Sequence, residues 1–191
     1  MLFGFKKSEI TIDDGTKFFL VEPVRPKRNP KHFIIFFHGL TESRLSLMAF
    51  EDLLKIKDAY IVSFDLLNHG DNIDDREFHF ETWHDEQVHY VRKLLDYLKK
   101  ENNAEKFIFF AVSFGGAVAL EFSALYPQYV ERLILYAPAI PECVNPNLTG
   151  DISQFFDHVA HPATNSVVLQ GIFKKKSESW PEVTRLFVLK F

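Results

Sequence analysis

The sequence contains little cysteine. Its one cysteine, Cys143, cannot form a disulfide within the chain, so the class of small domains that disulfides hold together is excluded. An unpaired thiol is most simply accommodated in a reducing compartment. We therefore predict a cytoplasmic protein.

Long apolar runs are also missing. The first ten residues, MLFGFKKSEI, contain too short an apolar segment for a signal peptide, and no run approaches the ~20 residues that cross a bilayer. Positive charge is not in excess, because 22 Lys and Arg stand against 26 Asp and Glu, a net charge of −4. This balance argues against a broad nucleic-acid-binding surface. We therefore expect no membrane span and no nucleic-acid partner.

Strand-like and helix-like segments alternate along the chain. Two strand-like runs flank Asp14-Gly15 within EITIDDGTKFFLVEP, and this dipeptide favours a hairpin turn. Buried strands are then predicted for HFIIFF, AYIVSFD, FIFF and RLILYAP, and helical spacing is found in ESRLSLMAFEDLLKI and from about Phe80 to Lys100. A content of 47% hydrophobic and 25% charged residues is enough for one core. This order predicts an α/β fold, in which helices cover both faces of a mostly parallel sheet after an N-terminal β-hairpin.

One serine, Ser113, is predicted to lie where a strand turns into a helix, within FIFFAVSFGGAVALEF. A sharp strand-to-helix turn brings two backbones close together, and Ala111, Gly115 and Gly116 are small enough to allow this. The N–H groups of a first helical turn have no partner inside the helix and favour a bound anion. The segment therefore indicates a nucleophilic serine, although tight packing or a nucleotide-binding turn would use the same residue types.

Two further motifs follow predicted strands, FHGLT at 37–41 and DLLNHGDN at 65–72. The carboxyl ends of parallel strands meet at one edge of a sheet, so both motifs are expected beside AVSFGG at 111–116. In their order and spacing the three motifs resemble those of the α/β-hydrolase superfamily, in particular its compact bacterial esterases and lipase-like serine hydrolases. The resemblance extends over roughly residues 9–141. It implies an α/β-hydrolase core over 1–141 and a cap-like or incomplete C-terminal segment of the same domain over 142–191.

The resemblance gives several residues a role. It implies that Oγ of Ser113 attacks the carbonyl carbon of a small carboxylic ester, thioester or amide. The backbone N–H groups of Leu40 and Phe114 would stabilise the oxyanion, while His38 would support the oxyanion loop rather than act as the base. No cofactor and no metal is implied, and the expected partner is a small-molecule ester substrate.

The remaining histidines have simpler explanations. HDEQVH is similar to the zinc-binding pattern H-E-x-x-H, but His84 and His89 are five residues apart, which separates them by about 140° around a helix. One metal ion cannot contact both, so we expect partly solvated helix residues. His69 is expected to shape its loop, and Asp85 to offset the helix dipole.

The rest of a catalytic triad is harder to locate. The family order is serine, then an acid, then histidine, the last two each after a further strand. Asp151, Asp157, His158 and His161 follow Ser113 in that order, but no recognisable final strand precedes either histidine. The last run, RLFVLKF, is similar to the start of a further strand, so we expect a chain that is truncated at its C-terminus.

Two classes of function stay open from the sequence. The first is a serine hydrolase whose acid and histidine come from the tail or from a longer parent protein. The second is a non-catalytic binding or scaffold protein that has the fold without a complete triad. A nucleophilic aspartate is disfavoured because serine occupies the position at the turn. The turn itself favours the first class, because a scaffold has no need of an exposed serine on a strained backbone.

Overall fold

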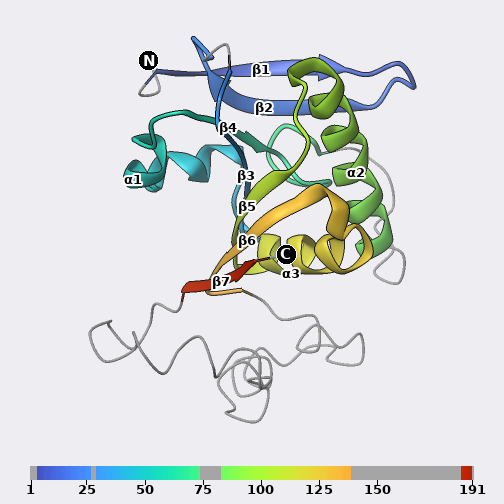
Figure 1. Cartoon of the computed structure of the whole chain (residues 1–191). Helices are drawn as coiled ribbons and strands as arrows, with labels where there is room; N and C mark the ends of the chain where they lie inside the picture. Colours follow the sequence, from blue (N-terminus) through green and yellow to red (C-terminus); the bar gives the residue numbers. More distant parts are fainter. Residues whose placement is uncertain (1–3, 27–28, 74–82, 139–185, 191) are drawn as a thin grey trace.

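The apolar runs of the sequence form one sheet in the computed structural model of the protein (Figure 1), which describes residues 4–26, 29–73, 83–138 and 186–190. The strands lie in the order β1-β2-β4-β3-β5-β6-β7. Their bounds are β1 Phe5–Thr11, β2 Lys17–Pro23, β3 His32–Phe37, β4 Ala59–Phe64, β5 Phe107–Val112, β6 Val130–Tyr136 and β7 Leu186–Lys190.

Strands β1 and β2 form the N-terminal hairpin that the sequence predicts. They pair antiparallel over their full length. At the turn between them Gly15 has a φ of +84°, a conformation that side chains disfavour, and Asp14 accepts a hydrogen bond from the N–H of Thr16. The residue types at the turn are therefore sufficient to predict where the hairpin turns.

The four central strands, in the order β4-β3-β5-β6, are parallel to one another. Both flanks are antiparallel, because β2 pairs with β4 and β7 pairs with β6. The three predicted motifs follow β3, β4 and β5, so they meet at the carboxyl edge of the parallel part. The C-terminal run that is similar to a further strand is indeed a strand, β7, and it runs antiparallel to β6.

Helices lie on both faces of the sheet (Figure 1), as the sequence predicts. On one face lie α2 (Trp83–Asn102) and α3 (Ser113–Leu125), and a short 3-10 helix, η2 (Pro127–Tyr129), leads from α3 to β6. The other face carries the 3-10 helix η1 (Arg44–Ala49) and α1 (Glu51–Leu54). The apolar stripe of α2 is buried in the larger of two cores, with Val88, Val91, Leu94, Leu95 and Leu98.

The helix predicted within ESRLSLMAFEDLLKI is divided into η1 and α1. Between them Phe50 has a φ of −103° and a ψ of 63°, which lie outside the helical region. The centroid of its ring lies 5.2 Å from those of Phe36 and Phe110. Packing of Phe50 against the sheet therefore overrides the helical spacing at this residue.

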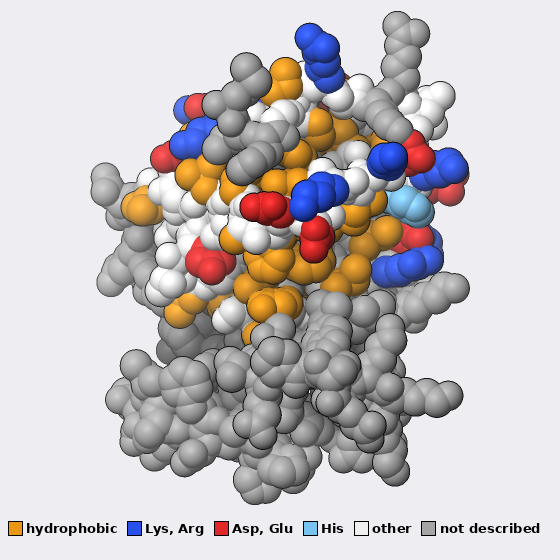
Figure 2. All heavy atoms as spheres, turned by 90° about the vertical axis from the view of Figure 1, so that its left-hand side faces the viewer, with side chains coloured by type: hydrophobic (Ala, Val, Ile, Leu, Met, Phe, Trp, Pro, Cys, Tyr) orange, Lys and Arg blue, Asp and Glu red, His pale blue; other side chains and the backbone are white. Residues whose placement is uncertain are grey.

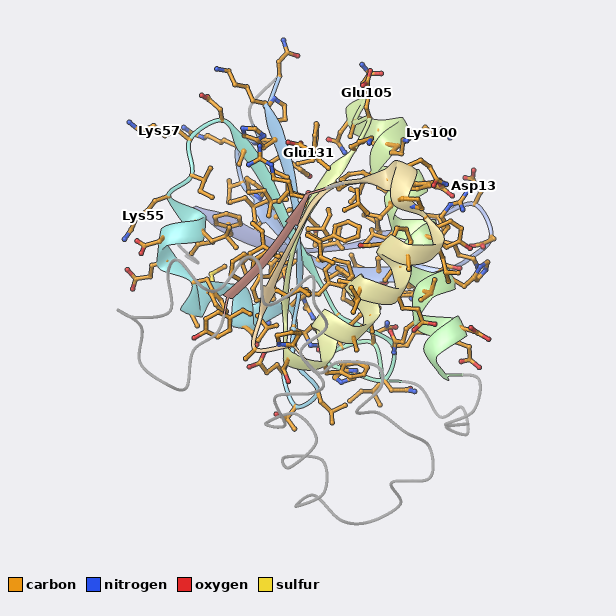
Figure 3. The ribbon with its side chains drawn as sticks, turned by 60° about the horizontal axis from the view of Figure 1, so that its bottom comes forward. Asp13, Lys55, Lys57, Lys100, Glu105 and Glu131 are labelled. Atoms are coloured by element: carbon orange, nitrogen blue, oxygen red, sulfur yellow. The ribbon has the colours of Figure 1, made fainter. Side chains whose placement is uncertain are left out.

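Apolar side chains are partly exposed on one outer face of the molecule. Figure 2 shows hydrophobic side chains gathered on the face that carries η1 and α1, where Phe110, Ile134 and Tyr136 are partly buried. Lys55, Lys57 and Lys100 extend outward from the ribbon in Figure 3. The carboxyl edge, where the three motifs meet, carries the candidate site.

Candidate active site

The turn between β5 and α3, residues 112–116, is here called the elbow. Val112 ends the strand with an extended backbone, and Ser113 begins the helix with a φ of +48°. A positive φ is uncommon for a residue with a side chain and marks local strain. Ser113 is half-buried and Val112 supplies no side-chain cap to the helix. The strand-to-helix junction predicted from the sequence is therefore present at Ser113.

The two glycines of the elbow leave no room for side chains. A Cβ on Gly115 would lie 2.5 Å from the carbonyl oxygen of His38 and 2.8 Å from the carbonyl carbon of Phe37. A Cβ on Gly116 would lie 2.8 Å from Cβ of Pro138. Gly115 thus allows α3 to approach the end of β3, and Gly116 allows it to approach the end of β6.

The motif after β3 forms a turn, residues 39–42, beside the elbow. The N–H of Gly39 donates to Oε2 of Glu42 at 2.9 Å, and the N–H of Glu42 donates to the carbonyl oxygen of Gly39 at 3.2 Å. A Cβ on Gly39 would lie 3.6 Å from Cβ of Ser113, so the turn and the serine are neighbours. Leu40, inside the turn, has a side chain that is 59% exposed.

His38 is fully buried and both of its ring nitrogens contact backbone groups. Nε2 accepts a hydrogen bond from the N–H of Leu66 at 3.0 Å, so the proton lies on Nδ1, which donates to the carbonyl oxygen of Gly39 at 2.8 Å. Burial away from water lowers the pKa of His38 to about 4. A neutral ring with both nitrogens engaged supports the loop, as the resemblance implies, and does not serve as a base for Ser113.

A buried ion pair joins the first residue of η1 to the loop after β4. Asp65 is 0% exposed and accepts hydrogen bonds from the backbone N–H and the guanidinium of Arg44 and from the N–H of Asp71. Arg44 is 4% exposed and also binds the carboxylate of Asp71. Sequence reasoning missed Arg44. The available signal was a single arginine at the start of an apolar run, RLSLMAF, where an unpaired charge would be unfavourable.

His69 shapes the loop after β4, as predicted. Its Nδ1 lies 2.8 Å from the carbonyl oxygen of Leu67, and its ring stacks on Phe114 with centroids 5.9 Å apart and planes at 14°. The centroid of the His38 ring lies 5.0 Å from that of the His69 ring. The loop therefore packs against the first residue after the candidate nucleophile.

Ala137 is a second strained residue beside Ser113 that the sequence did not indicate. Val112 pairs with Tyr136 in the sheet, so Ser113 and Ala137 each follow one member of the same pair. Ala137 has a φ of +44° and is exposed. Two adjacent strands thus end in left-handed residues at the same edge of the sheet.

Several residues considered from the sequence lie outside the described residues. They are Cys143 and the candidate acids and histidines of the tail, Asp151, Asp157, His158 and His161. Nothing is described of the side chain of His84, whereas His89 is exposed on α2.

Among the described residues no three His, Cys, Asp or Glu side chains are grouped as metal ligands. In the same part of the chain, no helix is both long and apolar enough to span a membrane.

A cavity of about 830 Å³ lies between the hairpin turn, the loop after β4 and α2. Ser113 is not one of the described residues that line it. Two of its charged lining residues are paired with each other, because Lys93 binds Asp14 at 2.7 Å. This cavity therefore does not contain the candidate nucleophile.

The chain matches the model of one protein family. The model of the family described as "Serine aminopeptidase, S33" matches residues 28–185, most of the chain, including all three motifs. No curated protein matches the sequence.

Solved structures of similar fold come from several kinds of protein. The Cfl2 protein of Burkholderia cenocepacia is 25% identical with a TM-score of 0.58, and the match covers 91% of this chain and 56% of that one. A membrane phospholipase A, described as a bacterial virulence factor, is 20% identical with a TM-score of 0.56, covering 72% and 41%. An epoxide hydrolase from Vigna radiata is 16% identical with a TM-score of 0.54, covering 70% and 40%.

The chain thus spans about two-fifths of the length of the phospholipase and the epoxide hydrolase. The likeness to these two concerns the fold alone. The family match together with the sheet order, the elbow and the motif turns leads to one conclusion. The chain belongs to this serine aminopeptidase family of α/β-hydrolases.

Proposed function

We propose that the protein is a serine hydrolase that cleaves a small carboxylic ester, thioester or amide through an acyl-enzyme on Ser113. The observation that carries the proposal is the left-handed φ of Ser113 at the first residue of α3, beside the turn 39–42. Strain of this kind is kept where function requires it. Membership of a hydrolase family supports the reaction class, and serine rather than aspartate at the elbow favours acyl transfer.

The chemistry has two stages. Oγ of Ser113 attacks the carbonyl carbon while its proton passes to a base, and the carbonyl oxygen becomes an oxyanion held by the backbone N–H groups of Leu40 and Phe114. The intermediate collapses, the leaving group takes the proton, and an acyl-enzyme stays on Ser113. Water then attacks the acyl carbon and gives a proton to the base. The second tetrahedral intermediate collapses, the bond to Oγ breaks, Oγ of Ser113 takes the proton back from the base, and the acid is released.

The base is proposed to come from outside the described residues. The ring nitrogens of His38 are held by the backbone, and the ring of His69 is stacked on Phe114. His32 begins β3 and so lies at the amino end of the parallel strands, opposite the edge that carries Ser113. His158 and His161 follow Ser113 along the chain and are candidates to be tested.

Hydrolysis of nitrophenyl acetate by the full-length protein tests this proposal, with Ser113→Ala as the variant and Ser123→Ala as its matched control. Ser123 lies on the same helix, and its hydroxyl donates to the carbonyl oxygen of Ala119 at 2.6 Å. Loss of a catalytic serine lowers turnover by about 10⁴- to 10⁶-fold. We expect that loss in Ser113→Ala and little change in Ser123→Ala.

Replacement of His158 and His161 by alanine, one at a time, would locate the base by a loss of similar size. Equal background rates in the wild type and in Ser113→Ala would contradict the proposal. That result would favour the alternative function, a non-catalytic binding or scaffold protein of the same fold.

A further inference from the structure

The turn 39–42 is closed from both ends by a single residue, Glu42. Its carboxylate accepts the N–H of Gly39 at 2.9 Å, and its own N–H donates to the carbonyl oxygen of Gly39 at 3.2 Å. Hydrogen bonds to an ionised acceptor are stronger than neutral ones. Glu42 is exposed, so this carboxylate reaches back to the backbone although water is available to it.

The carboxylate lies close to the candidate nucleophile. A Cβ placed on Gly39 would be 3.3 Å from Cδ of Glu42 and 3.6 Å from Cβ of Ser113. Two atoms at these distances from one point are no more than about 7 Å apart. Glu42 and Ser113 therefore both face the side of Gly39 on which a Cβ would lie.

The bonds to Gly39 fix the peptide that follows it. The carbonyl oxygen of Gly39 accepts hydrogen bonds from Nδ1 of His38 and from the N–H of Glu42. Because a peptide unit is planar and trans, its N–H points away from its C=O. Anchoring the carbonyl of Gly39 therefore also sets the direction of the N–H of Leu40.

The preceding peptide is held as well, since the carboxylate of Glu42 binds the N–H of Gly39. Gly39 is thus clamped between two anchored peptide planes. Without the carboxylate, the first of these planes would lose its partner and Gly39, the residue type with the freest backbone, would rotate more easily.

We propose that Glu42 is a positioning residue, whose carboxylate holds the turn 39–42 so that the N–H of Leu40 points at the developing oxyanion. This inference rests on the proposed function, in which Leu40 donates to that oxyanion. Glu42 does not itself touch the substrate in this role. Its effect is transmitted through the backbone of Gly39.

The negative charge of Glu42 is unfavourable for the reaction, although its hydrogen bond positions the turn. Cδ of Glu42 lies within about 7 Å of Cβ of Ser113, and a negative carboxylate near the reacting serine opposes the negative charge that forms on the oxyanion. Glutamine keeps the accepting oxygen without the charge, whereas alanine removes both. The two variants therefore separate positioning from electrostatics.

The experiment uses the full-length protein with Glu42→Ala, Glu42→Gln and Glu51→Ala. Glu51 is an exposed glutamate on α1 that pairs with Lys55 at 3.6 Å and serves as the control. One oxyanion donor contributes about 10²- to 10³-fold to kcat. We expect Glu42→Ala to lower kcat for nitrophenyl acetate about 10- to 100-fold with little change in KM, Glu42→Gln to restore most of it, and Glu51→Ala to have no effect.

A second measurement does not depend on catalysis. Exchange of the amide proton of Gly39 with solvent, followed by NMR, is expected to be faster in Glu42→Ala than in Glu42→Gln or Glu51→Ala. Unchanged exchange in Glu42→Ala would overturn the clamp. Faster exchange with unchanged kcat, or a kcat raised in both Glu42 variants, would overturn positioning.

Ser113→Ala keeps the two proposals distinguishable. If that variant hydrolyses the ester as fast as the wild type, the proposed function fails, and so does the role given to the Leu40 N–H. The exchange rate of Gly39 would still show whether Glu42 holds the turn.

Discussion

The elbow and the two loops beside it hold the candidate active site by opposite means. At the elbow, backbones approach so closely that side-chain atoms are excluded, and a Cβ on Gly115 would lie 2.5 Å from a backbone oxygen. In the loops after β3 and β4, buried side chains fill the space, and the carboxylate of Asp65 accepts three hydrogen bonds there. The elbow is fixed by sterics and the loops by electrostatics.

The two regions are therefore expected to be disrupted by opposite kinds of substitution. Adding atoms disrupts the elbow, because the packed backbones have no space for them. Removing atoms disrupts the loops, because each deleted acceptor leaves a buried donor without its partner. The following variants test that contrast.

The largest effect is expected from Gly115→Val. Its Cβ would overlap the backbone of β3, which cannot move as a flexible side chain can, so we expect a loss of about 4 kcal/mol or more in the free energy of unfolding. Urea denaturation measures it. Gly115→Ala should cost about 3 kcal/mol despite the better helix propensity of alanine.

Gly39→Ala is the control for the elbow, because its Cβ would meet the movable carboxylate of Glu42 at 3.3 Å. Its cost should stay below about 1 kcal/mol. Equal losses in Gly115→Ala and Gly39→Ala would contradict a steric origin of the elbow.

Asp65→Ala tests the loops. It leaves the guanidinium of Arg44 buried without its main partner, and breaking a buried pair from one side costs about 3 to 5 kcal/mol. Asp71→Ala removes a carboxylate that binds the same arginine but is 61% exposed, so its cost should be below about 1 kcal/mol. Similar losses for the two variants in urea denaturation would show that burial does not set the strength of this network.

A smaller change in the free energy of unfolding is expected when the pH is lowered, because His38 is buried. Its pKa in the folded protein, about 4, lies below the ordinary value of 6.5, so the unfolded chain binds more protons between these pH values. Stability should therefore fall as the pH drops through this window, by about 2 kcal/mol between pH 7 and pH 5.

Denaturation curves of the wild type and of His38→Gln at both pH values isolate this contribution. Glutamine can still accept the N–H of Leu66, and it does not titrate. Its stability should depend less on pH by the stated amount. An NMR titration in which His38 protonates near pH 6.5 would refute the account of a buried neutral ring.

The sequence was sufficient for the elbow because the requirement there is local. Small residues around Ser113 and the change from strand to helical spacing lie within ten residues of one another. The hairpin turn at Asp14-Gly15 was predictable for the same reason. The residue types of such short segments are sufficient to predict their local structure.

The loops were less predictable because their contacts are not local. Arg44 and Asp65 are 21 residues apart and meet only when β3 and β4 pair. The division of the helix at Phe50 likewise depends on rings of two different strands. The strained Ala137 has no sequence signal, and the residues considered for acid and base lie outside the described residues.

Covalent labelling tests the central claim, that Ser113 is the nucleophile, most directly. The full-length protein and its Ser113→Ala variant would be treated with a fluorophosphonate and mapped by peptide mass spectrometry. The account predicts one adduct on the peptide that contains Ser113, absent from the variant, with Ser123 in the same helix unlabelled. An unlabelled Ser113, or an adduct that persists in Ser113→Ala, would contradict it.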